Sequence, residues 1–368
     1  MIVKKIFRYP VKGLPGEALN AAPLGVGAGI DGDRRFAFGI DQTVDDGVWR
    51  SSRSYLINAV NDGLLKLTLS HSDGLWTIQN TDGEVVRFKS GEQASINTAN
   101  AVLAQFLSAI SGLEHGPVLI DRKRFEGPKG HWDFPDSELL IVNLATVREL
   151  EGRWRMEIDP RRFRANFLVD GIPAWSEFGL YGARFSIGGA EIDFLRPARR
   201  CAATSVNPDT GDRDAEILQR LVQDYGHGFF GVYARVSRAG TVSLADTMHC
   251  VAKEALPPSQ AVCEIAPDLS FWPRAAKMHR FEEHADRLTF GLSASGAWPI
   301  RAPDMSGKMK VHCGWQGAIV AEIQPTPTNE LFVAVNKNDE CKTNWLRNMA
   351  ESRGIVFVSG PFANRQGS

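Results

Sequence analysis

Cysteine is scarce in this sequence, and its spacing excludes several kinds of site. The 368 residues include five cysteines, an odd number, and no two of them form a C-x-x-C pair. Disulfide frameworks use even sets of cysteines, and zinc or iron–sulfur clusters use closely spaced ligands. The sequence therefore predicts no disulfide framework and no iron–sulfur cluster, and each cysteine has to be considered by itself.

Long apolar runs and an excess of one charge are also missing. The opening segment MIVKKIFRYPVKG is alternating and basic, without the apolar core of a signal peptide, and no later run is long enough to span a membrane. Lysine and arginine number 42 against 43 aspartate and glutamate, which gives a formal net charge of −1. Nucleic-acid-binding domains are typically basic. We therefore expect a cytoplasmic protein with neither a membrane nor a nucleic-acid partner.

Short alternating segments dominate the sequence and predict a β-rich α+β fold. Residues 2–8 alternate as a strand does, and Asp-Gly pairs at 73–74 and 82–83 separate short alternating runs, as hairpin turns do. Strands are expected to outnumber helices. Apolar residues recur at helical spacing in three segments, which we predict as helices: 98–111, 144–153 and 217–225.

Two connecting segments divide the sequence into three predicted domains. A charged stretch rich in glycine and proline, DRKRFEGPKGHWDFPD, covers residues 121–136, and LPPSQ follows residue 255. We predict a β-barrel-like domain at 1–125, a β-barrel with peripheral helices at 126–254, and a small α+β domain of unassigned type at 260–368.

Cys201 follows a run of arginines in RPARRCAATS. An isolated cysteine is most often a small buried apolar residue. However, Arg196, Arg199 and Arg200 would stabilise a thiolate, which is the form that acts as a nucleophile or as a soft-metal ligand. The residues alone leave three readings open: a structural cysteine, a redox thiol and a metal ligand.

The segment RRFRANFLVDG at 161–171 is predicted as a strand with Arg164 and Asn166 on one face. A guanidinium and an amide presented together suit phosphate or a hydrogen-bonding heterocycle. Surface ion pairs are the alternative role for these arginines.

Four segments in this order resemble the landmarks of a known family. They are YPVKG at 9–13, GIDGDRRFAF at 29–38, RRFRANFLVDG at 161–171 and RCAATSVNPDTG at 200–211. The sequence resembles proteins in which a MOSC N-terminal β-barrel domain precedes a MOSC domain. This group includes the mitochondrial amidoxime-reducing component and the C-terminal part of molybdenum cofactor sulfurase. The resemblance covers roughly the first 250 residues and implies that the first two predicted domains are these two.

The resemblance also implies a cofactor, the molybdenum cofactor (Mo-molybdopterin), and the residues that bind it. Cys201, in the R-C-x-x-T motif, would be the metal ligand and catalytic residue, with Lys12 and Arg34 near the phosphate. Arg164 and Asn166 match the arginine and asparagine of F-R-P-N. The R-C-x-x-T motif adds two further predicted contacts, Arg200 and Thr204.

Several positions depart from the family pattern. Gly13 stands where serine is common, which leaves a backbone N–H for the cofactor, and Arg199 stands where a small hydroxyl residue is common, which adds a cation. Ala165 replaces the proline of F-R-P-N. Asn143 and Thr146 belong to a helix entry that differs from that of the family, and we include Asn143 among the predicted contacts.

The resemblance favours an oxidoreductase that reduces N-hydroxylated small molecules by two electrons at a cysteine-ligated molybdenum. Electrons would come from a separate donor protein, because the C-terminal segment lacks the C-x4-C-x2-C spacing of a plant-type ferredoxin domain. Two alternatives remain. One is a sulfur carrier or cofactor-binding module with a persulfide on Cys201, and the other is a pocket serving a specialised biosynthetic reaction.

Overall fold

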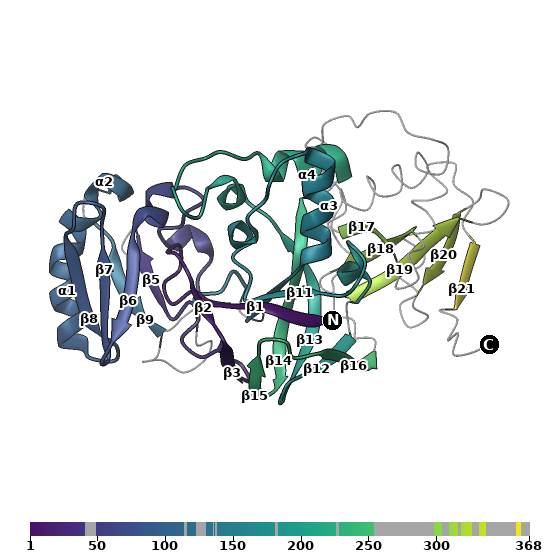
Figure 1. Cartoon of the computed structure of the whole chain (residues 1–368), viewed down its shortest axis with the longest axis horizontal. Coiled ribbons are helices and arrows are strands. Elements are labelled where there is room, and N and C mark those ends of the chain that lie inside the picture. Colours follow the sequence, from purple (N-terminus) through teal and green to yellow (C-terminus); the bar gives the residue numbers. More distant parts are fainter. Residues whose placement is uncertain are drawn as a thin grey trace.

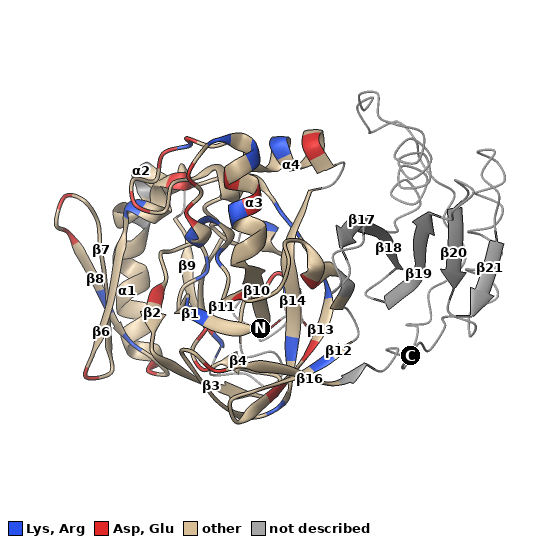
Figure 2. Ribbon diagram, turned by 45° about the vertical axis from the view of Figure 1, so that its right-hand side comes forward, with Lys and Arg blue, Asp and Glu red and all other residues tan. Residues whose placement is uncertain are grey.

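A computed structural model gives the structure of the chain. No described helix is both long and apolar enough to cross a membrane. Positive and negative side chains are interspersed along the described ribbon (Figure 2). The described residues are 1–40, 49–113, 116–122, 130–134, 136, 138–180, 183–225, 228–253, 298–303, 309–315, 318–325, 331–335 and 358–361.

An eight-stranded sheet forms the centre of the described structure (Figure 1). Adjacent strands in this sheet are antiparallel, except for β10 and β11, which are parallel. In spatial order the strands are β16 (Met248–Lys253), β12 (Ala183–Ile187), β13 (Ala190–Arg199), β14 (Phe229–Arg238), β10 (Leu139–Asn143), β11 (Phe167–Asp170), β1 (Ile2–Arg8) and β2 (Glu17–Leu19).

The sheet curls so that β1, next to one edge, meets the segment that precedes β16 at the other edge. Ile2 of β1 pairs with Thr247, which directly precedes β16. The Val3 amide donates to the Asp246 carbonyl at 3.0 Å, and the Ala245 amide donates to the Val3 carbonyl at 2.9 Å. The result is the curled, barrel-like sheet of a β-rich α+β fold, which confirms the predicted fold class.

Apolar residues on the inside of the curl form the larger core. β10 is buried along its whole length, as expected of a central strand with both faces covered. Helix α3 (Leu144–Trp154) contributes Val147, Leu150 and Trp154, and α4 (Ile217–Tyr225) contributes Ile217 and Leu221. Both helices lie where apolar spacing predicted them.

A second core belongs to residues 11–119. Here α1 packs against the hairpins, with Ile96 and Leu103 buried. The elements are β5 (Phe36–Gly39), the 3-10 helices η1 (Ser52–Ser54) and η2 (Asp62–Lys66), β6 (Thr68–Ser72), β7 (Leu75–Gln79), β8 (Val85–Lys89), α1 (Gln93–Phe106), α2 (Ser108–Ser111) and β9 (Val118–Asp121).

The strands of the first thirty residues lie with the larger core, which the sequence did not predict, whereas Val11 and Leu14 between them belong to the second core. β1 and β2 belong to the eight-stranded sheet. β3 (Ala21–Gly25) pairs with β15 (Gly240–Ser243) on one side and with β4 (Gly29–Ile30) on the other. Val3, Ile6, Leu24 and Ile30 are buried in the larger core. The segment therefore packs with residues that follow it by more than a hundred positions, while the predicted domain boundaries stay a prediction.

The C-terminal region contains a five-stranded sheet. Its strands follow chain order, antiparallel except for the last pair. They are β17 (Trp298–Pro303), β18 (Met309–Trp315), β19 (Ala318–Pro325), β20 (Leu331–Val335) and β21 (Val358–Pro361).

Two predicted elements differ from the structure. Residues 161–166 are not a strand, because Pro160 opens the 3-10 helix η4 (Pro160–Phe163) and Arg164 has a left-handed backbone, so only 167–170 is extended. The helix predicted at 98–111 starts earlier, at Gln93, and breaks at Leu107, whose ψ is 3°. In contrast, the hairpin at Asp73–Gly74 is confirmed.

Candidate functional site

A tight turn before β11 sets the position of Arg164. The Asp159 carboxylate accepts a hydrogen bond from the Arg161 amide at 2.8 Å and so caps η4. Proline at the first helical position suits such a turn because its fixed φ matches. Arg164 then adopts φ 53°. This conformation ends the turn and directs the Arg164 side chain to the N-terminal segment, where it meets Tyr9.

Two guanidinium groups lie over the ring of Tyr9. The Cζ atom of Arg164 is 4.4 Å from the ring centroid, and that of Arg34 is 4.7 Å from it. Arg34 Nη2 also donates to the Arg164 carbonyl at 2.8 Å. Burial raises the pKa of Tyr9 to about 12, although both arginines oppose the shift. Tyr9 is therefore a neutral phenol that offers its π face to two cations.

Arg164 is a half-buried cation with few partners. Its Nη1 donates to the Leu14 carbonyl at 2.6 Å, but its Nη2 has no hydrogen-bond partner among the described residues. Burial, and after it the Arg34 charge, lowers the pKa of Arg164 to about 10. Arg34, in contrast, pairs with Asp33 Oδ2 at 2.5 Å. A buried cation is stabilised by an anion or by hydrogen bonds, so Arg164 favours an anionic ligand.

Lys12 is itself buried and lies beside these arginines in a polar network that reaches the surface at Asp133. Its ammonium donates to the His131 carbonyl at 2.8 Å and to Asp133 Oδ1 at 3.0 Å. The Lys12 charge holds the pKa of Asp133 well below its usual range. The Tyr233 hydroxyl donates to Asp133 Oδ2 at 3.2 Å, and burial followed by the Asp133 charge raises the pKa of Tyr233. Lys12 is thus fixed in place as a cation.

Cys201 begins the 3-10 helix η6 (Ala202–Ser205), and its side chain is exposed. The Thr204 amide and hydroxyl both donate to the Cys201 carbonyl, at 3.2 and 3.0 Å. Thr204 is fully buried, so it fixes the backbone of the cysteine rather than facing solvent. The structural reading of Cys201 as a buried apolar residue is therefore wrong.

The arginines before Cys201 have different surroundings. Arg200 Nη2 donates to the Phe163 carbonyl at 2.7 Å, while the Arg200 Nε is buried without a partner among the described residues. Arg199 is exposed. Arg196 forms a two-point ion pair with Asp136, at 2.6 and 3.0 Å, so its charge is already balanced. Arg199 and Arg200 are thus the cations available next to the thiol. Lys12, Arg34, Arg164 and Arg200 are called the basic cluster below.

Asn166 connects the basic cluster to the sheet. Its Oδ1 accepts from the Leu140 amide at 3.0 Å and from Arg34 Nη1 at 3.3 Å, and its Nδ2 donates to the Phe7 carbonyl at 3.2 Å. The side chain joins three separate segments and orients Arg34. The structure thus brings Asn166 to the cluster as a supporting residue.

Asn143 lies in a different network. Its Oδ1 accepts from the Ala145 amide at 3.0 Å, which caps α3. Its Nδ2 donates to the Pro173 carbonyl and to Glu177 Oε2, both at 2.9 Å. Both amide hydrogens and the oxygen are engaged, and none of these contacts involves the basic cluster.

Gly13 follows Lys12 in a conformation that other residues rarely adopt. Its φ is +89°, and an added Cβ would lie 3.1 Å from the Leu56 carbonyl oxygen. Serine at this position would be strained. The departure from the family pattern at Gly13 therefore has a backbone cause.

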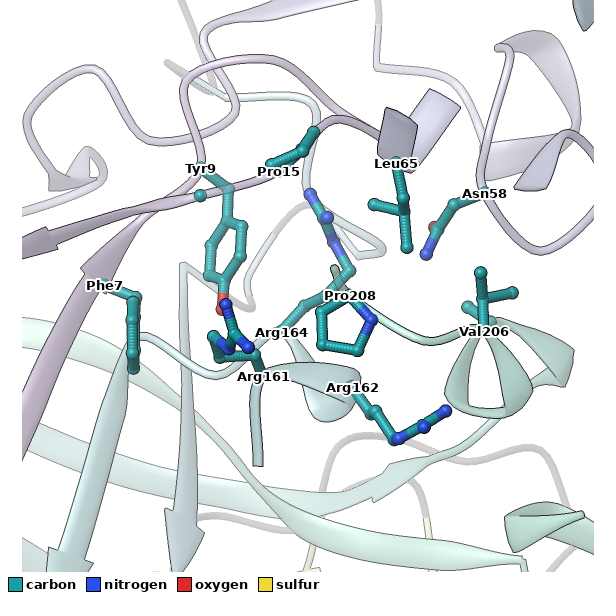
Figure 3. Close-up of a pocket in the computed structure, with 12 residues that line it drawn as sticks. Phe7, Tyr9, Pro15, Asn58, Leu65, Arg161, Arg162, Arg164, Val206 and Pro208 are labelled. Carbon is teal, nitrogen blue, oxygen red and sulfur yellow. The ribbon is translucent and has the colours of Figure 1, made fainter. Parts of the chain in front are cut away.

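A pocket connects the basic cluster to the Cys201 turn (Figure 3). Its empty space, with open solvent at the mouth included, is about 440 Å³, of which only about 50 Å³ admits the centre of a water molecule. Arg164 lies on it together with Phe7, which packs against the larger core, and Leu65 of η2. The lining residues are Phe7, Tyr9, Pro15, Gly16, Asn58, Leu65, Arg161, Arg162, Arg164, Ala203, Val206 and Pro208.

Two contributors to the site were missed at the level of sequence. Tyr9 lies inside the YPVKG segment, so the motif contained a signal for it. Asp133 lies in a segment that composition assigned to a connection, and its pairing with Lys12 spans 121 positions. A long-range ion pair of this kind leaves no trace in local spacing.

The assembled site combines an exposed thiol, a pocket and buried cations. Unpartnered guanidinium nitrogens are donors for an anion such as phosphate. A thiolate is a ligand for soft metals and also a nucleophile. Among the described residues, no group of three or more histidine, cysteine, aspartate and glutamate side chains could hold a metal ion.

Comparison with known proteins identifies one segment of the chain. Residues 122–249 match the family model described as MOSC domain. Molybdenum cofactor sulfurase from Drosophila melanogaster is 33% identical over 135 residues, which are 36% of this chain and 17% of that protein. The Caenorhabditis elegans molybdenum cofactor sulfurase is 34% identical over 105 residues, or 27% and 14% of the two chains. The chain thus covers less than a fifth of these relatives.

Solved structures were also compared. The YUAD protein from Bacillus subtilis aligns with 67% of this chain and 93% of its own, at 12% identity and a TM-score of 0.33. YiiM from Escherichia coli aligns with 33% of this chain and 58% of its own, at 25% identity and a TM-score of 0.25.

Proposed function

Because the chain contains a MOSC domain at residues 122–249, homologous to part of molybdenum cofactor sulfurase, we propose that it binds the molybdenum cofactor with Cys201 as the metal ligand. We propose further that it is an oxidoreductase that reduces N-hydroxylated small molecules by two electrons. One observation carries the proposal: the exposed Cys201 begins a turn that lines the same pocket as Arg164, whose Nη2 is buried without a partner among the described residues.

The donor set suits this cofactor. Its phosphate would accept hydrogen bonds from Arg164 Nη2 and Arg200 Nε, two buried nitrogens without partners among the described residues. Arg34 and Lys12 would add positive charge. The Cys201 thiolate, a soft ligand, would bind the molybdenum. When bound, the cofactor would supply the redox chemistry.

The chain's own residues would orient the reacting groups. Thr204 fixes the Cys201 backbone through two hydrogen bonds. Tyr9 holds Arg34 and Arg164 over its ring. As a neutral phenol it does not neutralise their positive charge. Lys12 is held by Asp133, so it is ordered before any ligand arrives. Such preorganisation lowers the cost of ordering on binding.

The remaining parts of the proposal concern partners and location. We propose a small-molecule substrate and a separate electron-donor protein, because the sequence lacks the spacing of a ferredoxin-type cluster. We propose a cytoplasmic protein that acts without nucleic acid or membrane, because its charge is balanced and its sequence has no long apolar run.

The test is the molybdenum and pterin content of the full chain, purified from a host that makes the cofactor. We expect near-stoichiometric content in the wild type and loss of molybdenum in Cys201→Ser. Cys250→Ser is the matched control, since Cys250 is also exposed and lies on β16. Equal molybdenum in all three proteins would reject Cys201 as the ligand, and no molybdenum in any would reject the cofactor.

A sulfur-carrier function is the second candidate, favoured by the exposure of Cys201 next to Arg199 and Arg200. Cations stabilise a thiolate, and thiolates accept and pass on sulfur. This candidate predicts that Cys201 of the purified protein gains the mass of one sulfur atom in the absence of molybdenum. A reductant-sensitive gain at Cys201 but not at Cys250, measured by peptide mass spectrometry, would support it over the oxidoreductase.

A further inference from the structure

Asn58 is buried without using its amide. The side chain is 5% exposed and makes no hydrogen bond with the part of the chain that the structure describes. Buried amides nearly always have partners, because losing water without replacement costs free energy. Asn61, three positions later, behaves in the ordinary way and donates to the Ile110 carbonyl at 3.2 Å. The Asn58 amide atoms are not among the fully buried polar atoms without a partner, so they reach solvent and are open to a ligand.

The Asn58 amide faces the pocket beside the Cys201 turn. Figure 3 shows it directed into the space between Leu65 and Val206. Arg164, on the same pocket, has its unpartnered Nη2. An amide offers a donor and an acceptor side by side, whereas a guanidinium only donates. A ligand in this pocket would therefore meet donors from two residues and an acceptor from one.

The walls around these groups are mostly apolar. Phe7 and Tyr9 come from the first strand and the residue after it, and Leu65, Val206 and Pro208 add further apolar surface. Arg161, Arg162 and Arg164 supply the positive charge of the lining. Aromatic and aliphatic walls suit the faces of a flat ring. A phosphate would have no use for the Asn58 acceptor and no benefit from apolar walls. The lining thus favours a planar heterocycle at this end of the site.

We propose that Asn58 binds the pyrimidinone edge of the cofactor's pterin and so adds a contact from the smaller core. This inference rests on the proposed function. A pyrimidinone edge displays an N–H next to a carbonyl oxygen, which complements the oxygen and NH₂ of one amide. Asn58 lies outside the four family-like segments.

Arg213 holds the Asn58 segment against the Cys201 turn. Its Nη2 donates to the Ala59 carbonyl at 2.8 Å, and its Nε donates to Asp62 Oδ2 at 3.0 Å. Its Nη1 donates to the Ser205 hydroxyl at 3.1 Å. One side chain thus fixes the residue that follows Asn58 and the turn that begins at Cys201, which keeps the two sides of the pocket in register.

The experiment is a fluorescence titration with 6-hydroxymethylpterin, a probe without molybdenum or phosphate. It uses the full chain from a host unable to make the cofactor, as wild type, Asn58→Leu, Asn58→Asp and Asn61→Leu. We expect both Asn58 variants to bind the probe about tenfold or more weakly, the effect of losing a paired amide. Asn58→Leu should keep or raise the melting temperature, because its amide has no protein partner to lose. Asn61→Leu should melt lower and bind normally.

The outcomes separate this inference from the proposed function. Wild-type affinity in a folded Asn58→Leu overturns the role of Asn58 and leaves cofactor binding in place. A lower melting temperature in Asn58→Leu with unchanged affinity assigns the residue to structure and also overturns it. If the wild type binds neither the probe nor, from a competent host, the cofactor, the proposed function and this inference both fail.

Discussion

Gly13 illustrates how one backbone angle selects the residue beside a functional lysine. Replacing it by serine combines an unfavourable positive φ with a Cβ 3.1 Å from the Leu56 oxygen. We expect Gly13→Ser to lower the free energy of unfolding by about 2 kcal/mol, within the range for strained residues. The measurement is denaturant unfolding, with Gly74→Ser as the control. Gly74 also has a positive φ, but nothing lies within 4 Å of its Cβ. Equal losses would show that crowding at Gly13 has no effect.

The same scale shows which site residues the sequence can predict. Lys12, Arg34 and Arg164 were predicted because each lies in a short contiguous motif, and the structure places Arg34 and Arg164 over the ring of Tyr9. Asn58 could not be identified from the sequence. Its amide has no hydrogen-bond partner among the described residues, and the pocket wall that it faces is formed by residues 145 to 150 positions later in the chain. A local sequence motif shows which residue types occur together. Whether an amide lacks a hydrogen-bond partner depends on how the folded chain packs around it.

At the scale of elements, a buried carboxyl group contacts the beginning of α3. Glu177, in η5 (Ser176–Leu180), accepts from Thr146 Oγ1 at 2.8 Å and from Asn143 at 2.9 Å, with no cation beside it. Burial, opposed by these hydrogen bonds, raises the pKa of Glu177 from 4.5 to about 7. A raised pKa means that the folded state binds the proton more tightly than the unfolded state does.

Stability should therefore be highest below pH 4.5 with respect to Glu177, and should fall as the pH rises through about 7. The total loss is ~3 kcal/mol at 1.36 kcal/mol per pKa unit. Glu177→Gln should remove this part of the pH dependence, which unfolding curves between pH 4 and about 8 would measure. The exposed Glu216→Gln is the control and should follow the wild type. A Glu177→Gln profile parallel to the wild type would contradict the assignment.

The Cys201 turn is a second element whose order depends on one residue. Arg213 donates to Ser205 of the turn and to Ala59 and Asp62 across from it. Without it, the turn should open more often, so amide hydrogen exchange at Thr204 and Val206 should accelerate by about fivefold to tenfold, equivalent to ~1 kcal/mol. Arg213→Lys should not restore protection, because one ammonium cannot reach the same acceptors. Arg235→Ala, which removes another surface arginine, is the control. Unchanged exchange in Arg213→Ala would show that the turn is held by its own hydrogen bonds.

Element prediction succeeded where periodicity and turn chemistry agreed. α3, α4 and the Asp73–Gly74 hairpin lie where the sequence predicted them. The strand predicted over 161–171 failed at its first half, because the alternation of Phe163, Ala165 and Phe167 is equally satisfied by a 3-10 turn that buries the same side chains. The Asp159–Pro160 pair was the available signal for that turn.

At the scale of the whole molecule, the β-rich fold was predictable, but the partners of its first thirty residues were not. Alternation predicts a strand without naming its neighbour. β1 lies between β11 and β2 and also pairs with Thr247, so its neighbours come from both ends of residues 1–253. The pocket inherits this arrangement, since Phe7 and Tyr9 reach it from one end and Val206 from the other.

The pairing of Ile2 with Thr247 also has a consequence for synthesis. A ribosome releases β1 first, yet the segment that closes the sheet against it emerges about 245 residues later, at a rate of about 5–20 residues per second. During that interval, β1 has an open edge and its apolar residues Val3 and Ile6 lack their final neighbours. Closure of the large core is therefore a late event for this strand, while the core of residues 11–119 has all its sequence available early.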